Sequence, residues 1–336
     1  MESFAAEPIR IVFFGTPAYA VPALEALAAD NRVRIPLVVS QPDRPAGRGR
    51  RLTAPAVKQT ALSLGLPVYQ PETLRTENDR TPIAGASADL FVVAAFGKIF
   101  GPKLLALPRI GSVNLHASIL PDYRGASPIS AAILEGGFRT GVTLMGMETG
   151  LDTGPILAQR SVDIESFDTT ASLTPKLAQL GARLLIDSLD ELVSGQLTPI
   201  VQDDTEASLT RPMAKADGWI DWSQPAEVIE RQIRAMWDWP RAWTTFEGSP
   251  LQIHQATILP ESAGDAPGQI VLRSEGAAVA TGSGQVLIVL GQAAGGKPLP
   301  GRLLLERAAQ GSIILGAQGA PEAPKLPLIR PVTNTL

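Results

Sequence analysis

Near the N-terminus the sequence reads Ile9-Arg-Ile-Val-Phe-Phe-Gly-Thr-Pro17 and continues with Val21, Leu24, Leu27 and Ala28 at helical spacing. A short apolar run, a turn and an amphipathic helix in this order are typical of the β-turn-α unit that opens an α/β sheet. The Gly-Thr-Pro turn lacks the three-glycine fingerprint of a dinucleotide-binding fold. We therefore expect an α/β sheet that does not bind NAD.

Further strand candidates follow, and helical patterns separate most of them: residues 33–39, 67–69, 89–95, 112–116 and 142–147. Alternation of this kind predicts a Rossmann-like α/β domain with a twisted, mostly parallel sheet that helices cover on both faces. Apolar residues from Leu173 to Val193 then predict one long amphipathic helix, with Thr169 or Thr170 as its N-cap.

The chain has 336 residues, which exceeds a typical single hydrophobic core, so we expect two domains. Helical periodicity is lost after residue 195, and short alternating runs from residue 243 onward predict a small antiparallel, OB-like β-barrel. We place the first domain at 1–194, a linker at 195–212 and the barrel at 213–320. Residues 321–336 form a Pro-rich tail that cannot continue a helix or a central strand, and we expect it to be loosely held.

Composition narrows the class of protein. Hydrophobic residues make up 45% and charged residues 18%, no apolar run approaches the ~20 residues that cross a bilayer, and the acidic N-terminus lacks a signal pattern. We expect a cytoplasmic protein without a membrane partner. Cysteine is absent, which excludes thiolate chemistry. A net charge of −4 argues against nonspecific coating of nucleic acid, so DNA is not an expected partner.

Two polar residues end the strand expected at 112–116. Asn114 and His116 are two positions apart, so their side chains point to one face, and a turn-rich segment follows them. The C-terminal ends of strands are where open α/β sheets bind ligands. His254, the other histidine, follows an apolar alternation typical of a structural strand. On these residues alone, a pair of satisfied core polar groups remains an alternative.

Motifs along nearly the whole chain resemble those of the 10-formyltetrahydrofolate-dependent formyltransferases, and within them the methionyl-tRNA formyltransferase family. They are Phe-Gly-Thr-Pro at 14–17, Gln-Pro-Asp-Arg-Pro-Ala-Gly-Arg-Gly-Arg-Arg at 41–51, Asn-x-His at 114–116, Ser-Ile-Leu-Pro at 118–121, Arg-Gly-Ala-Ser-Pro at 124–128, Gly-Leu-Asp-Thr-Gly at 150–154 and Ile-Asp-Trp at 220–222.

The resemblance implies transfer of a formyl group from 10-formyltetrahydrofolate to the α-amino group of initiator methionyl-tRNA, which gives N-formylmethionyl-tRNA for translation initiation. Asn114 and His116 would stabilise the oxyanion of a tetrahedral intermediate. Asp152 would move protons. It lies 36 positions after His116, so only the resemblance brings it near. Without that resemblance, a turn or capping aspartate is an equal alternative.

The resemblance also implies a folate site. Ser118, Ile119, Leu120 and Pro121 match the segment that lines the cofactor in this family, and residue 119 departs from the family's Leu. By analogy, Phe96 and Gly97 border the flat pterin, although ordinary packing at a strand end would also explain them. No metal is expected, since the polar cluster lacks ligand spacing.

The resemblance implies that an arginine loop selects the acceptor. By resemblance Arg44, Arg48, Arg50 and Arg51 reach toward the tRNA acceptor stem. With Lys58 they give five cations against one acid within 41–58 of an acidic chain, although such a charge run can also be a solvated surface. Residues 215–320 carry eight cations and ten acids, so any tRNA contact there requires the cations to be segregated on one face.

Two other functions remain open. One keeps the folate chemistry but uses an amino sugar, a ribonucleotide or water as the acceptor, and the arginine loop and second domain argue against it. The other is a noncatalytic tRNA-binding module, in which Asn114, His116 and Asp152 would be dispensable. The joint presence of these three residues argues against that function.

Overall fold

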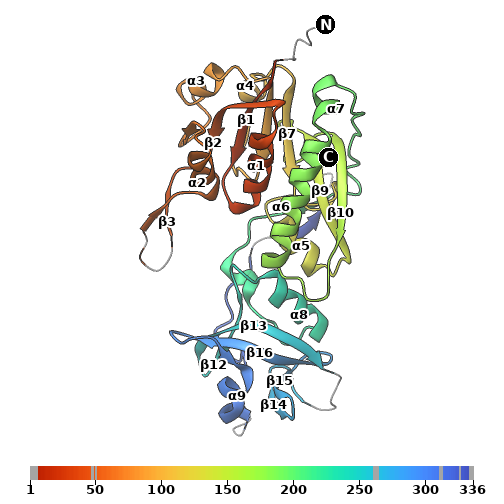
Figure 1. Ribbon diagram of the computed structural model, residues 1–336. Coiled ribbons are helices and arrows are strands. Elements are labelled where there is room, and N and C mark those ends of the chain that lie inside the picture. The colour runs from red at the N-terminus through yellow and green to blue at the C-terminus, as the bar shows by residue number, and fades with distance from the viewer. Residues whose placement is uncertain are drawn as a thin grey trace.

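The computed structural model describes residues 7–46, 49, 51–259, 265–309, 313–324 and 327–332. Figure 1 shows two lobes, the N-terminal one built on a mixed sheet and the C-terminal one rich in antiparallel strands. No helix of these described ranges is both long and apolar enough to cross a membrane.

The N-terminal sheet has seven strands in the order β10-β9-β7-β6-β1-β2-β5. β1 pairs in parallel with β2 and β6, and β5 and β7 extend the parallel part, whereas β9 is antiparallel to both β7 and β10. The mostly parallel α/β sheet is thus confirmed, and β10 is an addition that the sequence pattern did not predict. The strand bounds are β1 (Ile9–Gly15), β2 (Val33–Val39), β5 (Val68–Tyr69), β6 (Leu90–Ala94), β7 (Gly111–His116), β9 (Arg139–Gly146) and β10 (Ile156–Asp163).

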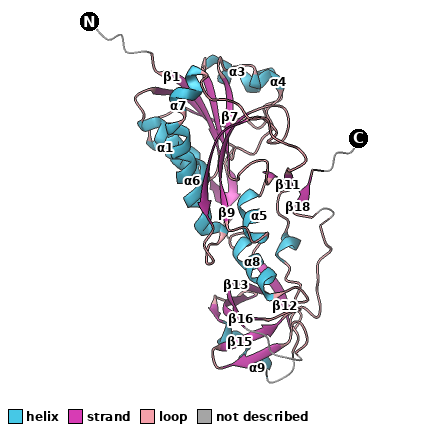
Figure 2. Cartoon of the chain, turned by 90° about the vertical axis from the view of Figure 1, so that its right-hand side faces the viewer, coloured by secondary structure: helices cyan, strands magenta, loops and turns pink. Residues whose placement is uncertain are grey.

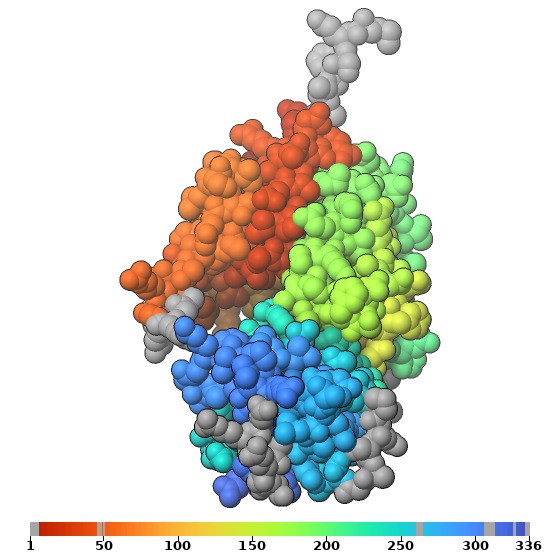
Figure 3. Space-filling view, turned by 60° about the horizontal axis from the view of Figure 1, so that its bottom comes forward, coloured from red at the N-terminus to blue at the C-terminus, as the bar shows by residue number. Residues whose placement is uncertain are grey.

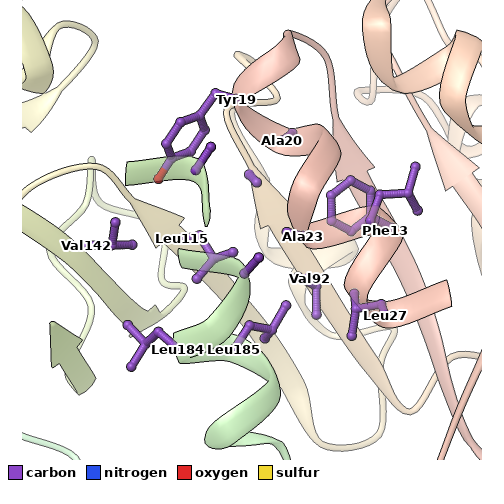
Figure 4. Close-up of a cluster of buried hydrophobic side chains, with 14 of the residues drawn as sticks. Phe13, Tyr19, Ala20, Ala23, Leu27, Val92, Leu115, Val142, Leu184 and Leu185 are labelled. Carbon is purple, nitrogen blue, oxygen red and sulfur yellow. The ribbon is translucent and has the colours of Figure 1, made fainter. Parts of the chain in front are cut away.

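Helices bury both faces of this sheet, which explains why residues 11–14 of β1 are all apolar and buried. Successive side chains point to opposite faces, so Phe13 packs in one core with α1 and α6, while Phe14 packs in another with Phe91. Figure 4 shows the first core, where side chains of β1, α1 and α6 meet those of β6, β7 and β9. The helices of this lobe are α1 (Val21–Ala29), α2 (Ala56–Ser63), α3 (Glu77–Gly85), α4 (Pro102–Leu105), α5 (Pro128–Leu134), α6 (Thr170–Asp187) and α7 (Leu189–Ser194).

The single long helix expected from Leu173 to Val193 is two helices, α6 and α7. Ser188 is the C-cap of α6 and the N-cap of α7, with a ψ of −4° that departs from helical geometry. The apolar spacing continues across this break, so the pattern alone could not reveal it. The N-cap prediction is confirmed at Thr169, whose side chain accepts a hydrogen bond from the Ser172 N–H.

The C-terminal lobe is an antiparallel sheet in the order β12-β13-β16-β15-β14, with β17 beside β16, and its antiparallel character is confirmed. Helix α8 (Ala226–Ala235) begins after Pro225 and buries Ile229 and Ile233 in the core of this lobe. The other elements are β12 (Ala242–Phe246), β13 (Ser249–Leu259), β14 (Ile270–Arg273), β15 (Gly276–Ala280), β16 (Gln285–Ala293), β17 (Leu299–Pro300) and α9 (Gly301–Ala309).

A small third sheet, in the order β18-β11-β8, joins three distant parts of the chain. β11 (Ser208–Thr210) is parallel to β8 (Arg124–Gly125) and antiparallel to β18 (Ile329–Pro331), and Figure 2 shows β11 and β18 side by side. The expectation of a loosely held tail is therefore wrong for residues 329–331. Pro331 is tolerated because β18 is an edge strand, where a missing N–H leaves no ladder bond unmade. The proposed domain boundaries remain predictions.

The two lobes are tied together at α5, α6 and α8. The Arg231 Nε donates to the Leu134 carbonyl at 3.1 Å, and the Thr170 hydroxyl donates to the Ala235 carbonyl at 2.7 Å. The Arg234 Nη1 donates to the carbonyl of Asp168 at 2.9 Å. Asp168 therefore stands at the N-terminus of α6 and at the junction of the lobes.

Asp168 should make the stability of the fold pH-dependent. Burial raises the pKa of this carboxyl, but hydrogen bonds from Lys176 and Ser172 outweigh burial, so its pKa is below the ordinary value. A lowered folded-state pKa means that the carboxylate stabilises the fold above the unfolded pKa of about 3.9, and that this contribution disappears as pH falls through the folded pKa. Asp168→Asn should cost about 2 kcal/mol at pH 7.

Chemical denaturation of Asp168→Asn and the parent protein at several pH values tests this expectation. The difference in unfolding free energy should be full at neutral pH and shrink below about pH 4. Asp163→Asn is the matched control, because Asp163 forms an ion pair with Arg139 on the surface, where 66% of its side chain is exposed. If the two unfolding free energies differed by the same amount at every pH, the lowered pKa of Asp168 would be contradicted.

Candidate active site

The structure brings together the three residues proposed for catalysis. Asn114 and His116 lie in the last three residues of β7, and Asp152 lies in the loop between β9 and β10. The Asn114 Nδ2 donates to Oδ1 of Asp152 at 3.3 Å, and Oδ2 of Asp152 lies 3.5 Å from the His116 Nδ1. The alternation of β7 thus aims two polar groups at one carboxylate.

The carboxylate of Asp152 is also held by the backbone. The Gly125 N–H in β8 donates to Oδ2 at 2.9 Å, and only 16% of the Asp152 side chain is exposed. Asp152 itself has a φ of +53°, a left-handed conformation that residues with a Cβ seldom adopt. Three residues therefore hold its carboxylate: Asn114 and Gly125 donate hydrogen bonds, and His116 contributes a ring nitrogen.

His116 is buried, and both of its ring nitrogens face oxygen atoms. Nε2 lies 2.9 Å from the Tyr123 carbonyl, while Nδ1 faces Asp152. A carbonyl oxygen only accepts, so Nε2 carries a hydrogen and donates it to Tyr123. Nε2 is thus engaged in this conformation. Asn114 retains one amide hydrogen beyond the one that it donates to Asp152.

The segment 118–121, proposed to line the folate, forms a turn fastened to β9. The Ser118 hydroxyl is fully buried and donates to the Asp122 carbonyl at 2.6 Å, and the Leu120 N–H donates to the Thr143 hydroxyl at 3.1 Å. Leu120 packs in a small buried cluster with Met145 and Ile156. Ile119 and Pro121 are partly exposed, so these two residues of the segment have side-chain surface left for a ligand.

Phe96 and Gly97 follow β6, but the Phe96 ring points into the protein. It is 1% exposed, and its centroid lies 5.5 Å from that of Phe14 and 6.0 Å from that of Phe100. The Phe96 carbonyl accepts a hydrogen bond from Gln41 Nε2 at 2.7 Å. Any contact with a pterin here would use the backbone of 96–97 and not the aromatic ring. Strand-end packing, the alternative reading, accounts for the ring itself.

The arginine loop is a β-hairpin of β3 (Arg44–Ala46) and β4 (Arg51–Thr53). Arg44 and Arg51 are exposed, and Arg48 and Arg50 lie outside the described residues. The hairpin projects from the N-terminal lobe (Figure 1) and borders a hollow between the orange and the blue segments of the surface (Figure 3). It therefore presents cations beside an open space between the lobes.

Lys58, counted among the loop cations, forms an ion pair within the protein. Its Nζ binds Oδ2 of Asp43 at 2.9 Å, and hydrogen bonds from Gln70 and Lys58 hold the pKa of the Asp43 carboxyl below its usual range. At the base of the hairpin, the Arg44 Nη2 donates to Oε1 of Gln41 at 3.4 Å. Gln41 in turn binds the Phe96 carbonyl, so the hairpin is fastened to the sheet near β6.

Two residues that contact this site could not be identified from the sequence. Arg124 is 2% exposed and Gln202 is 8% exposed, and Gln202 binds the backbone of the Asp152 loop. Arg124 belongs to a motif that we noted but did not assign, whereas Gln202 lies in the aperiodic linker, where no spacing singles it out.

Two models of known protein families match most of this chain. Residues 9–189 match the family model for formyl transferases, and residues 212–309 match that for the C-terminal domain of formyl transferases. The chain therefore belongs to the formyl transferase family.

Curated relatives place it more narrowly. It is 48% identical over 293 residues to the methionyl-tRNA formyltransferase of Roseiflexus castenholzii, covering 87% of this chain and 94% of that one. It is 46% identical over 312 residues to that of Thiobacillus denitrificans, covering 92% and 100%. Within the family, the chain belongs with the methionyl-tRNA formyltransferases.

Solved structures support the fold alone, since their identities are low. HypX from Aquifex aeolicus in complex with tetrahydrofolic acid superposes with a TM-score of 0.58 at 18% identity, over 90% of this chain and 48% of HypX. The N-formyltransferase from Helicobacter canadensis, in complex with folinic acid and dTDP-3-aminofucose, superposes with a TM-score of 0.61 at 19% identity, over 83% and 97%.

Asp152→Asn tests the carboxylate at the centre of this site. The amide has the same size and keeps an oxygen for the Gly125 N–H, but it cannot take up a proton. We expect kcat for formyl transfer to fall by about 10²- to 10⁴-fold, the usual contribution of a general acid or base. Thermal melting should stay close to that of the parent protein. A variant that retains full turnover would exclude proton transfer by Asp152.

Proposed function

We propose that this chain transfers the formyl group of 10-formyltetrahydrofolate to the α-amino group of initiator methionyl-tRNA, in the cytoplasm. The observation that carries the proposal is the contact of Asn114, His116 and Asp152 in a chain that belongs with the methionyl-tRNA formyltransferases. The product, N-formylmethionyl-tRNA, serves translation initiation.

The chemistry begins with attack of the methionyl amine on the formyl carbon. A new C–N bond forms, and the formyl oxygen becomes an oxyanion in a tetrahedral intermediate. The free amide hydrogen of Asn114 stabilises that charge, a role in which one donor typically contributes about 10² to 10³ in rate. The bond between the formyl carbon and N10 then breaks, and the oxyanion returns to a carbonyl.

Proton movement balances this exchange. The attacking nitrogen loses one proton, and N10 of the folate gains one as it leaves, so no proton is consumed overall. Asp152 is the acceptor, directly or through a water, and returns the proton to N10. The His116 Nδ1 lies 3.5 Å from its Oδ2 and, with the ring hydrogen on Nε2, faces the protonated carboxyl group as a hydrogen-bond acceptor between the two transfers.

The folate is a co-substrate, and the exposed parts of two segments support its placement. Ile119 and Pro121 offer apolar side-chain surface beside His116, and the backbone at 96–97 borders the same end of the sheet. Gly97 has a φ of +77°, a conformation that favours glycine, and a Cβ there would lie 2.7 Å from the end of the Gln41 side chain. Because this position carries no side chain of its own, a flat ring could lie against its backbone. We propose that the reaction needs no metal.

The methionyl-tRNA contact is proposed for the hairpin of β3 and β4. Arg44 and Arg51 are exposed on it, and Arg48 and Arg50 extend the charge in sequence. β2, which leads into the hairpin, ends at the same sheet edge as β6 and β7. A phosphate backbone bound by the hairpin would thus place its aminoacyl end within reach of Asn114 and Asp152.

One assay tests the whole proposal. The protein is incubated with 10-formyltetrahydrofolate and methionyl-tRNA, free methionine, an amino sugar, a ribonucleotide or buffer alone, and the formylated product and released tetrahydrofolate are quantified. Formyl-methionyl-tRNA should form, and the other acceptors should give little product. Release of tetrahydrofolate in buffer alone would indicate hydrolysis, and binding of tRNA without turnover would indicate a noncatalytic module.

Joint replacement of Arg48, Arg50 and Arg51 by Ala should weaken use of methionyl-tRNA and flatten its salt dependence. Each lost phosphate contact reduces the slope of log affinity against log salt by about 0.7 to 0.9. Replacing Arg109, Arg139 and Arg160 is the matched control, since these arginines pair with acids on the surface and the change in net charge is the same. Equal salt slopes in both triple variants would exclude the hairpin as the site of tRNA contact.

A further inference from the structure

Gln202 is a buried glutamine whose side-chain amide spans the loop that carries Asp152. Its Nε2 donates to the carbonyl of Asp152 at 2.9 Å and to that of Gly154 at 2.6 Å. We propose that Gln202, oriented by Arg124, is a positioning residue that fixes Asp152 for proton transfer. This inference rests on the proposed function and adds to it a role for the segment that connects the two lobes.

The loop needs such support because its backbone is unfavourable by itself. Asp152 adopts the left-handed conformation, which is uncommon for a residue with a Cβ and persists only where surrounding contacts over-determine it. The loop is also tightly wound, since a Cβ at Gly154 would lie 1.9 Å from the Gly146 carbonyl oxygen. The two bonds from Gln202 hold the main chain at and after the strained residue.

Arg124 determines which way the Gln202 amide points. The Arg124 Nε donates to Oε1 of Gln202 at 3.0 Å, and its Nη1 donates to Asp204 Oδ1 at 2.8 Å. Because the guanidinium only donates, Oε1 must face it, and the NH₂ group must face the two carbonyls. The arginine is 2% exposed, so this orientation is set inside the protein.

The same short strand holds Asp152 from its other side. Arg124 and Gly125 are consecutive in β8, and the Gly125 N–H donates to the carboxylate of Asp152. One strand therefore controls the side chain of Asp152 directly and its main chain through Gln202. Because the partners of Gln202 among the described residues are backbone carbonyls and Arg124, its loss should change the alignment of the carboxylate and not the surfaces that bind either substrate.

The experiment compares Gln202→Ala with Gln232→Ala. Gln232 lies in α8 and makes the same pattern of bonds, from Nε2 to the carbonyls of Asp217 and Trp219, both at 2.8 Å. Gln202→Ala should lower kcat by about 10- to 100-fold, as expected for a misplaced catalytic group, with KM for both substrates nearly unchanged. Gln232→Ala should lower the melting temperature by a similar amount and keep its kcat.

A second variant keeps the test decisive if Gln202→Ala folds poorly. Gln202→Glu retains the length and the acceptor for Arg124 but, when ionised, cannot donate to the two carbonyls, so its kcat should fall as well. Parental kcat in both Gln202 variants, or equal losses of kcat in the Gln202 and Gln232 variants, would overturn the inference. Failure of the proposed function would differ, because the unaltered protein would then form no formyl-methionyl-tRNA.

Discussion

The carboxylate of Asp152 is the group on which the site depends, because three residues from two strands contact it at once. Its oxygens meet the Asn114 amide and the His116 ring on β7 and the Gly125 N–H on β8. A carboxylate with only 16% of its side chain exposed is stabilised when its oxygens are hydrogen-bonded, so each of these elements contributes to holding it. The antiparallel β9, which returns the chain beside β7, is what allows the following loop to fold onto the two polar side chains.

Large hydrophobic cores hold this arrangement rigid. β1 is an interior strand of the sheet and is covered on both faces, with Phe13 in one core and Phe14 in the other. Neighbouring strands are fixed to it in register, so the ends of β2, β6 and β7 stay aligned. The hairpin then carries exposed charge away from this apolar frame, and the Lys58–Asp43 pair anchors its base. The buried apolar side chains and the exposed charges of the hairpin thus lie in separate parts of the lobe.

Much of this could be predicted from sequence where a local period exists. The alternation in β7 correctly put Asn114 and His116 on one face, and the parallel strands followed from their apolar runs. Only the family resemblance placed Asp152 near these two residues, because no helical or strand periodicity connects it with His116, 36 positions earlier. β8, β11 and β18 have two or three residues each, which is too short for any pattern to register. The inward-facing Phe96 ring and the helix break at Ser188 depend on tertiary packing, which a one-dimensional pattern does not contain.

The small sheet β18-β11-β8 also bears on how far the enzyme is modular. The family model for the catalytic part ends at residue 189, before Gln202, β11 and β18, although all three contact or support the strand beside Asp152. Recombination between relatives that cuts the chain at such a boundary would separate the Asp152 carboxylate from the residues that hold its loop. A workable chimera would have to inherit residues 202–210 and 329–331 from the same parent as β8.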